Sequence, residues 1–142
     1  MSDYNSDILM WSESQAALLR RLAAGEHIND LIDWENVAEE VESVGREQLH
    51  AVESLLFQAL VHILKAQGWP ESVDAWKWRA DARGFAAQAR RRFVPSMRQR
   101  IDVAGLYDDA LKAVPETMDG RGPLPLAPVR ALTLDELLLG QQ

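Results

Sequence analysis

Three glutamates near the start of the chain have residue types and a spacing that could do chemistry. Glu35, Glu39 and Glu42 stand at positions i, i+4 and i+7, with Arg46 at i+11, so a helix would place all four on one stripe. Three carboxylates on one face can bind a hard cation through oxygen ligands. They can also pair with arginines on a neighbouring helix, and Arg79 and Arg83 offer such a stripe. We favour ion pairs between helices; a solvated acidic face and a metal or catalytic site are the alternatives, so no metal ligand or catalytic residue is assigned.

The histidines give weaker signals. Glu47 and His50 form one Glu-x-x-His motif, whereas the di-metal sites of helical bundles need two copies and further glutamates. On a continuous helix both side chains would also point away from the apolar stripe. His62 lies in the most apolar part of the chain, and we interpret it as a residue at the edge of the core with one hydrogen-bond partner. The sequence therefore predicts no metal or other cofactor.

Three tryptophans gather at a turn that Gly68 and Pro70 predict. Trp69, Trp76 and Trp78 follow the longest predicted helix, and packing of this turn is the favoured interpretation. The alternative is an aromatic-lined ligand pocket that includes His62.

The middle of the chain is basic although the net charge is −7. Residues 1–60 carry twelve acidic and three basic side chains, whereas residues 61–100 carry nine basic and three acidic ones. We expect the basic helix to pack beside the acidic ones. The alternative is a surface that binds nucleic acid or another polyanion. Its residues would be Arg90, Arg91, Arg92, Arg98 and Arg100. No helix-turn-helix pattern accompanies them, so nucleic acid is not the favoured partner.

The elements that must position these residues are predicted to be helices. Apolar residues recur at the helical period, and no segment alternates with the period of a strand. The predicted helices cover, in order, residues 6–24, 34–67, 73–93, a fourth from Pro95 to about residue 114, and 133–139. The second has its apolar stripe at Trp34, Val37, Val41 and Val44, continues to Ile63, and is weakened only by Gly45. Thr133 and Glu136 form a capping-box pattern for the last helix. The prediction is an all-α bundle of four main helices, with a long second helix and a short C-terminal one.

Length and composition suit one domain over residues 1–142 with a single core. Residues 1–5 are predicted to be disordered, and residues 119–131 to form a loop rich in proline and glycine. The chain has no cysteine, which excludes disulfides, thiolate metal sites and thiol nucleophiles. The start, MSDYNSD, lacks the basic region of a signal peptide, and the longest apolar run is too short for a bilayer. We expect a cytoplasmic protein without a membrane partner.

Several segments, in this order, resemble a known family. DILMWSESQAALLR has an acidic start and a tryptophan, WENVAEEVESVGRE is the most characteristic run, and LVHILKAQGWPE closes the long helix. WRADAR, VPSMRQRI and LTLDELL follow. Together they resemble the bacterial domain-of-unknown-function family 29. The resemblance implies an α-helical domain, mostly bacterial, with no assigned activity.

The sequence does not specify a biochemical function, and whether the protein is an enzyme stays open. The favoured hypothesis is a non-catalytic interaction module that could self-associate through an exposed helix face. The second is a small-molecule or metal-dependent site between the tryptophan turn and the glutamate and arginine stripes. The third is polyanion binding through the arginines of residues 90–100.

Overall fold

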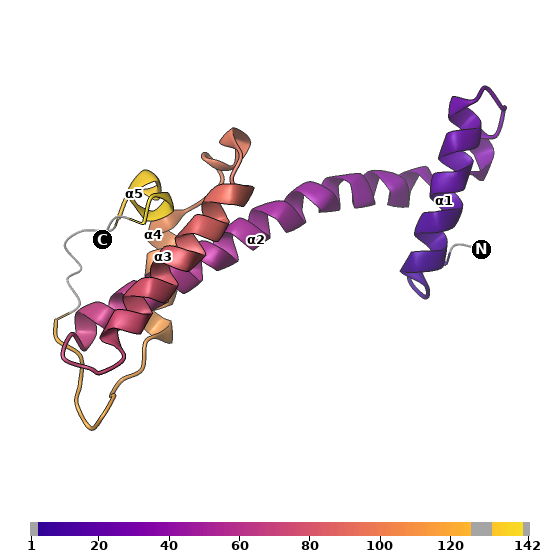
Figure 1. The fold of residues 1–142 in the computed structure, drawn as a ribbon. Coiled ribbons are helices and arrows are strands. Elements are labelled where there is room, and N and C mark those ends of the chain that lie inside the picture. Colours follow the sequence, from indigo (N-terminus) through magenta and orange to yellow (C-terminus); the bar gives the residue numbers. More distant parts are fainter. Residues whose placement is uncertain (1–2, 126–131, 141–142) are drawn as a thin grey trace. The chain divides into compact units, whose positions relative to one another are not determined.

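The computed structural model describes residues 3–125 and 132–140, and its regular elements are helical. The main helices are α1 (Ile8–Ala23), α2 (Trp34–Gly68), α3 (Ala75–Arg92) and α4 (Val103–Ala113), followed by the short α5 (Leu134–Leu138). Two short 3-10 turns, η1 (Asn29–Leu31) and η2 (Pro95–Met97), lie between them (Figure 1). The described residues contain no strand. The predicted all-α class, with four main helices and a short last one, is confirmed.

Two compact units divide the chain where one core was expected. The first is Met1–Glu47 and the second is Gln48–Gln142. In the described part of the first unit, Trp11 and Ile32 are the buried apolar side chains. The main hydrophobic cluster begins at Val52 and lies entirely in the second unit. The single core expected over residues 1–142 is therefore replaced by two separate sets of buried side chains.

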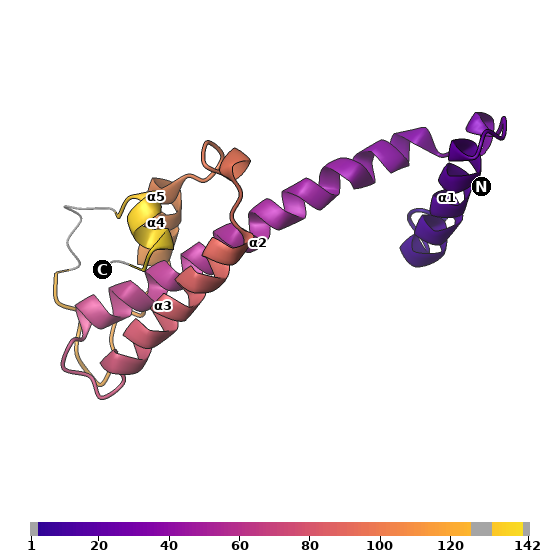
Figure 2. The ribbon, with the colours of Figure 1, turned by 45° about the horizontal axis from the view of Figure 1, so that its top comes forward.

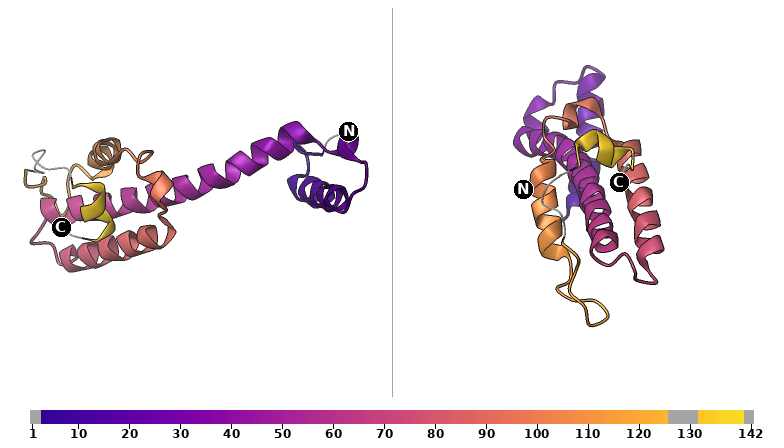
Figure 3. Two further views of the ribbon diagram at one scale, coloured as in Figure 1. Left: turned by 90° about the horizontal axis from the view of Figure 1, so that it is seen from above. Right: turned by 90° about the vertical axis from the view of Figure 1, so that its left-hand side faces the viewer.

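Helix α2 is continuous through Gly45, as its apolar period predicted. Its second half supplies the fully buried side chains of Val52, Leu56, Leu60 and Leu64. In the second unit this half lies between α3 and α4 (Figures 2 and 3). Alanines at Ala82, Ala86, Ala89 and Ala110, all nearly or fully buried, give α3 and α4 small contact surfaces. Small residues at contacts let helices approach closely, so the repeat of alanines explains this packing.

The short helix α5 closes the same core. Leu137 and Leu138 are buried, and the segment begins at Thr133, whose hydroxyl accepts a hydrogen bond from the Glu136 backbone N–H at 3.2 Å. The hydroxyl also donates to Glu136 Oε1 at 3.1 Å. The predicted capping-box pair therefore forms here.

The fourth helix begins later than predicted. Pro95 starts only the short turn η2, and α4 begins after Asp102, whose carboxylate accepts the Gly105 backbone N–H at 3.1 Å. An aspartate N-cap satisfies one of the free N–H groups of a first turn, which fixes the start of α4 at Val103. The predicted single helix from Pro95 is wrong because the Asp102 cap starts a separate helix at Val103.

The ends and loops also differ from expectation. Residues 3–5, within the segment predicted to be disordered, belong to a turn in which the Asp7 N–H donates to the Asp3 carbonyl at 2.7 Å. Residues 1–2 lie outside the described residues. Of the loop predicted at 119–131, residues 119–125 are non-helical as expected, and 126–131 lie outside the described residues.

Helix α2 is long and apolar enough to cross a bilayer, judged by length and composition alone. Nearly half of its most apolar window is buried inside the protein. The core helix of a globular protein meets the same criteria, so this is weak evidence for a membrane span.

Candidate functional site

The predicted glutamate stripe lies on the exposed first half of α2. Glu35, Glu39 and Glu42 are all exposed, and Arg46 continues the stripe. Arg46 pairs with Glu39, and its Nη1 lies 3.7 Å from Glu42 Oε2. These pairs lie within one helix, where exposed ion pairs contribute about 0.3–0.5 kcal/mol. Glu39 and Glu42 thus have Arg46 as a partner on their own helix. The sequence placed Arg46 on their stripe but did not predict these ion pairs.

The arginines proposed as partners across helices, Arg79 and Arg83, are exposed on α3 in the second unit. Pairing of these arginines with Glu39 and Glu42 would join the two units. That pairing stays a prediction.

The apolar stripe of the first half of α2 is exposed, contrary to prediction. Trp34 is 48% exposed, Val41 69% and Val44 62%, where all three were expected in the core. Ala38 and Gly45, which lie beside them on the helix surface, are exposed as well. We call these five residues the exposed α2 face. Helical period predicts which residues share a face, but only tertiary packing determines whether another element covers it.

The first residues of the chain contact α2 through Glu40. The Tyr4 hydroxyl donates to Glu40 Oε1 at 2.5 Å, and the Tyr4 ring meets Trp11 edge-on at 4.9 Å. Trp11 in turn donates from Nε1 to Asp33 Oδ2 at 3.0 Å. The hydrogen bond to Glu40 raises the pKa of Tyr4 above its ordinary value of 10.0, because the carboxylate accepts the proton that ionisation would remove. These polar contacts fix the first unit around a small apolar centre.

His62 has the environment that the sequence predicted. Its side chain is mostly buried at the core edge, with Nδ1 2.7 Å from the Gln58 carbonyl oxygen and the ring 5.2 Å from that of Phe85. Asp81 Oδ2 lies 4.0 Å from Nε2. The histidine is therefore held by its own helix and by α3.

The three clustered tryptophans have different environments. Trp69 is buried, whereas Trp76 is 66% exposed. Trp78 is half-buried against the core, with Lys65 Nζ 5.9 Å from its ring centre. Packing of the turn, the favoured interpretation, therefore applies to Trp69 and Trp78 but not to Trp76.

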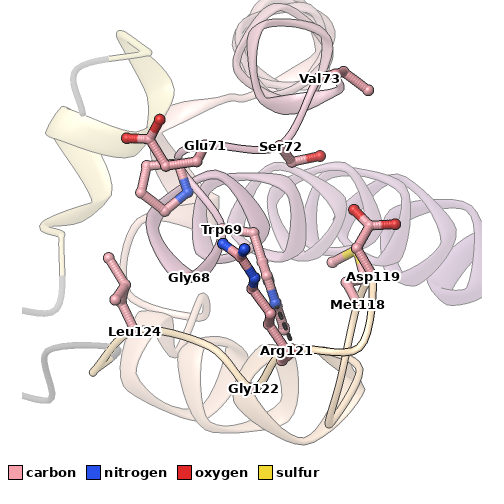
Figure 4. Close-up of a pocket in the computed structure, with 11 residues that line it drawn as sticks. Gly68, Trp69, Glu71, Ser72, Val73, Met118, Asp119, Arg121, Gly122 and Leu124 are labelled. Carbon is pink, nitrogen blue, oxygen red and sulfur yellow. Dashed lines mark hydrogen bonds between the residues drawn. The ribbon is translucent and has the colours of Figure 1, made fainter.

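A cavity of about 420 Å³ lies beside Trp69. Its walls are the turn after α2 and the segment that follows α4, as Figure 4 shows. Of the predicted pocket residues it includes Trp69, whereas His62, Trp76 and Trp78 lie outside its lining. The lining residues are Gly68, Trp69, Pro70, Glu71, Ser72, Val73, Met118, Asp119, Arg121, Gly122 and Leu124.

Sequence reasoning missed the second wall of this cavity. Met118 and Arg121 exchange both backbone hydrogen bonds, at 2.9 and 3.0 Å, and close a two-residue turn. The central residues Asp119 and Gly120 have φ angles of 53° and 75°, in the left-handed region. Asp-Gly is a preferred dipeptide for such turns, so the signal was present in the sequence. Nothing in the sequence alone indicated that this turn would lie against Trp69.

The basic region is partly used to hold α5. Arg90 Nη1 donates to the Leu138 carbonyl at 2.7 Å, and Arg98 Nη1 lies 3.0 Å from Asp135 Oδ1. The other arginines of the region, Arg91, Arg92 and Arg100, are exposed. The polyanion surface is therefore smaller than the sequence suggested.

The isolated Glu-x-x-His motif is exposed on α2, as its helical phase predicted. Among residues 3–125 and 132–140, no group of three or more histidine, aspartate or glutamate side chains is placed to hold a metal ion.

Fold and surfaces together define an all-α protein whose long helix is covered on one half and exposed on the other. Within that class, the chain belongs to the family described as domain of unknown function DUF29, whose model matches residues 4–138. This confirms the resemblance drawn from the sequence motifs. The family description assigns no activity.

A solved structure is similar to this chain over most of its length. It is the crystal structure, at 1.45 Å resolution, of an alpha-helical protein of unknown function from Rhodospirillum rubrum ATCC 11170. The two chains are 28% identical, the match covers 95% of this chain and 88% of that one, and the TM-score is 0.62. Among curated proteins, no match is found.

Proposed function

We propose that this protein is a non-catalytic interaction module that binds a partner helix on the exposed α2 face. The observation that carries the proposal is the exposure of Trp34, Val41 and Val44 on one side of a regular helix. Large apolar side chains grouped on one helix face are typical of protein–protein contacts.

The spacing on α2 suits a helical partner. Residues 34, 38, 41, 45, 48, 52, 55 and 59 alternate steps of four and three, which is the seam on which one helix packs along another. In the second unit the same seam is buried at Val52 and Ala59. In the first unit its positions at Trp34, Ala38 and Val41 are exposed. A seam that serves as core in one half of the helix is thus left open in the other.

Charge indicates the chemistry of the partner. The first unit, Met1–Glu47, carries eleven acidic and three basic side chains, a net charge of −8. Glu35 and Glu42 flank the seam on one side, whereas Val37 and Val44 lie beside it on the other. Two copies of this face would bring like charges together, which opposes self-association through it. A partner helix with an apolar stripe flanked by lysine or arginine fits both the seam and the glutamates beside it.

The test uses the full-length protein and two synthetic amphipathic helices with the same leucine stripe. One peptide has lysines beside the stripe and the other has glutamates. We expect the lysine peptide to bind, and Val41→Ser to weaken binding about tenfold, since buried contacts near an interface centre contribute more than about 1 kcal/mol. Fluorescence anisotropy measures the affinity.

The matched control is Val73→Ser, because Val73 is also an exposed valine but lies in the second unit. It should leave the affinity unchanged. Equal binding of both peptides, or equal effects of the two valine substitutions, contradicts the proposal. Sedimentation of the protein alone tests whether a second copy of the chain occupies this face instead of a partner helix. A dimer that Val41→Ser dissociates would show that it does.

We also propose that the protein is bacterial and cytoplasmic. The similar chain from Rhodospirillum rubrum supports the first, and the acidic, cysteine-free composition supports the second. Fractionation of cells that express the tagged protein tests the location; recovery with the membrane fraction contradicts it.

A further inference from the structure

The cavity beside Trp69 has the features of a binding site that is independent of the exposed α2 face. Its volume of about 420 Å³ falls within the range of about 300–1,000 Å³ common for small-molecule sites. All its lining residues belong to the second unit, so its geometry depends on one compact body.

Both walls of the cavity are fixed by hydrogen bonds. Trp69 Nε1 donates to the Arg121 carbonyl at 3.0 Å across 52 residues of sequence. The Leu124 N–H donates to the Gly68 carbonyl at 2.8 Å, at the end of α2. In the other wall, the Ser72 N–H donates to the Trp69 carbonyl at 3.1 Å. A site whose backbone is already ordered loses little conformational entropy when a ligand binds.

Side chains of both charge signs border this space. Arg121 extends beside Trp69, and the carboxylates of Glu71 and Asp119 lie on opposite sides of it in the view of Figure 4. Within the described residues, no salt bridge of 4.0 Å or less joins Arg121 to either carboxylate. The guanidinium and the carboxylates are therefore available to a ligand. Trp69, Met118 and Leu124 supply apolar surface.

This combination favours one class of ligand. A simple carboxylic acid would gain from Arg121 but meet repulsion from Glu71 and Asp119. An amine without an acid group would gain from Glu71 and Asp119 but meet repulsion from Arg121. A molecule with both a carboxylate and an ammonium group can satisfy both signs, and an apolar body can cover Trp69.

We infer that the cavity between the turn after α2 and the Met118–Arg121 turn binds a free α-amino acid with an apolar side chain. The carboxylate pairs with the Arg121 guanidinium. The ammonium lies toward Glu71, where the partial negative charge at the end of α2 adds to that of the carboxylate. The apolar side chain contacts Trp69.

Titration calorimetry with three matched probes tests the ligand class. L-leucine carries both charged groups, 4-methylpentanoate lacks the ammonium, and L-leucinol lacks the carboxylate. We expect L-leucine to bind and each analogue to bind at least about tenfold more weakly, as expected for the loss of one charge-assisted contact. No heat of binding with L-leucine at millimolar concentration, or equal affinity for all three probes, overturns the inference.

A substitution and its control locate the binding. Arg121→Ala keeps the backbone carbonyl that accepts from Trp69, so the walls should remain, and binding of L-leucine should weaken at least about tenfold. Arg91→Ala removes an exposed arginine of α3 outside the cavity and should change nothing. Circular dichroism confirms that both variants are folded. If Arg121→Ala were unfolded, the change in tryptophan fluorescence that L-leucine causes in the unmodified protein is compared with that in Trp69→Phe. The change should be lost in Trp69→Phe, and a change as large as in the unmodified protein overturns the inference.

Discussion

Asp102 illustrates how a single side chain decides the start of a helix in this protein. Its carboxylate caps α4 by accepting the Gly105 N–H, and a Cβ placed on Gly105 would lie 2.6 Å from Asp102 Oδ2. With the Asp102 carboxylate in this position, a side chain at residue 105 would have to displace it. Gly84, in the middle of α3, has nothing within 4 Å of the same added atom.

These two glycines should respond differently to alanine. Gly84→Ala should raise the free energy of unfolding by about 0.5–1 kcal/mol, since alanine loses less backbone entropy in a helix. Gly105→Ala should raise the free energy of unfolding by less than Gly84→Ala, or lower it, because moving the Asp102 carboxylate weakens a cap that contributes about 1 kcal/mol. Urea unfolding with equal m-values measures both. An equal gain at the two sites would show that the cap tolerates a methyl group.

Among the elements, α5 depends most on contacts outside itself. A helix of five residues is too short to be stable alone, and its position comes from the buried Leu137 and Leu138 and from the Arg90 bond to the Leu138 carbonyl. The Arg98–Asp135 pair has side chains that are 50% and 67% exposed, so it contributes at most about 1 kcal/mol. Burial of leucine, rather than charge, holds the element.

The cap of α5 can be tested separately. Thr133→Ala removes the hydroxyl that accepts the Glu136 N–H, and should lower the free energy of unfolding by about 1 kcal/mol. Thr117→Ala, at an exposed position outside any helix, is the control and should change it by less than about 0.5 kcal/mol. Chemical denaturation compares the two variants. Indistinguishable unfolding curves would mean that Thr133 is not needed for α5 to pack.

At the scale of the whole molecule, the buried apolar side chains are unevenly distributed between the two units. The second unit contains the main apolar cluster, whereas the first relies on Trp11, Ile32 and several polar contacts. Net charge is also unevenly distributed: the first unit carries −8, whereas the whole chain carries −7. The first unit is therefore both less supported by apolar burial and more self-repelling.

This difference should appear in native-state hydrogen exchange. Backbone amides of α1 and of residues 34–47 should exchange faster than those of residues 52–66, because local opening costs less where few apolar contacts are lost. Since residues 34–47 and 52–66 belong to one continuous helix, helix type cannot explain a difference between them. Mass spectrometry of peptic fragments measures it. Equal protection along α2 would contradict the view that the two halves differ in stability.

The sequence alone determined the helices, their order and most of their bounds, because apolar period and caps act over a few residues. It indicated the uninterrupted α2 through Gly45, the capping box at Thr133 and the core-edge position of His62, all of which depend on local spacing. It also identified the family. Helical phase likewise placed Arg46 on the stripe of Glu39 and Glu42, which it pairs with.

Only the tertiary structure decided which faces are covered. The stripe from Trp34 to Val44 has the same period as the buried stripe after Val52, so no local pattern separates the exposed half of α2 from the buried half. The cavity required Trp69 and Arg121 to meet across 52 residues, whereas His62, Trp76 and Trp78, which are closer to Trp69 in sequence, are absent from its lining. Contacts of this kind depend on how distant segments pack, and the spacing of residues along one helix carries no information about them.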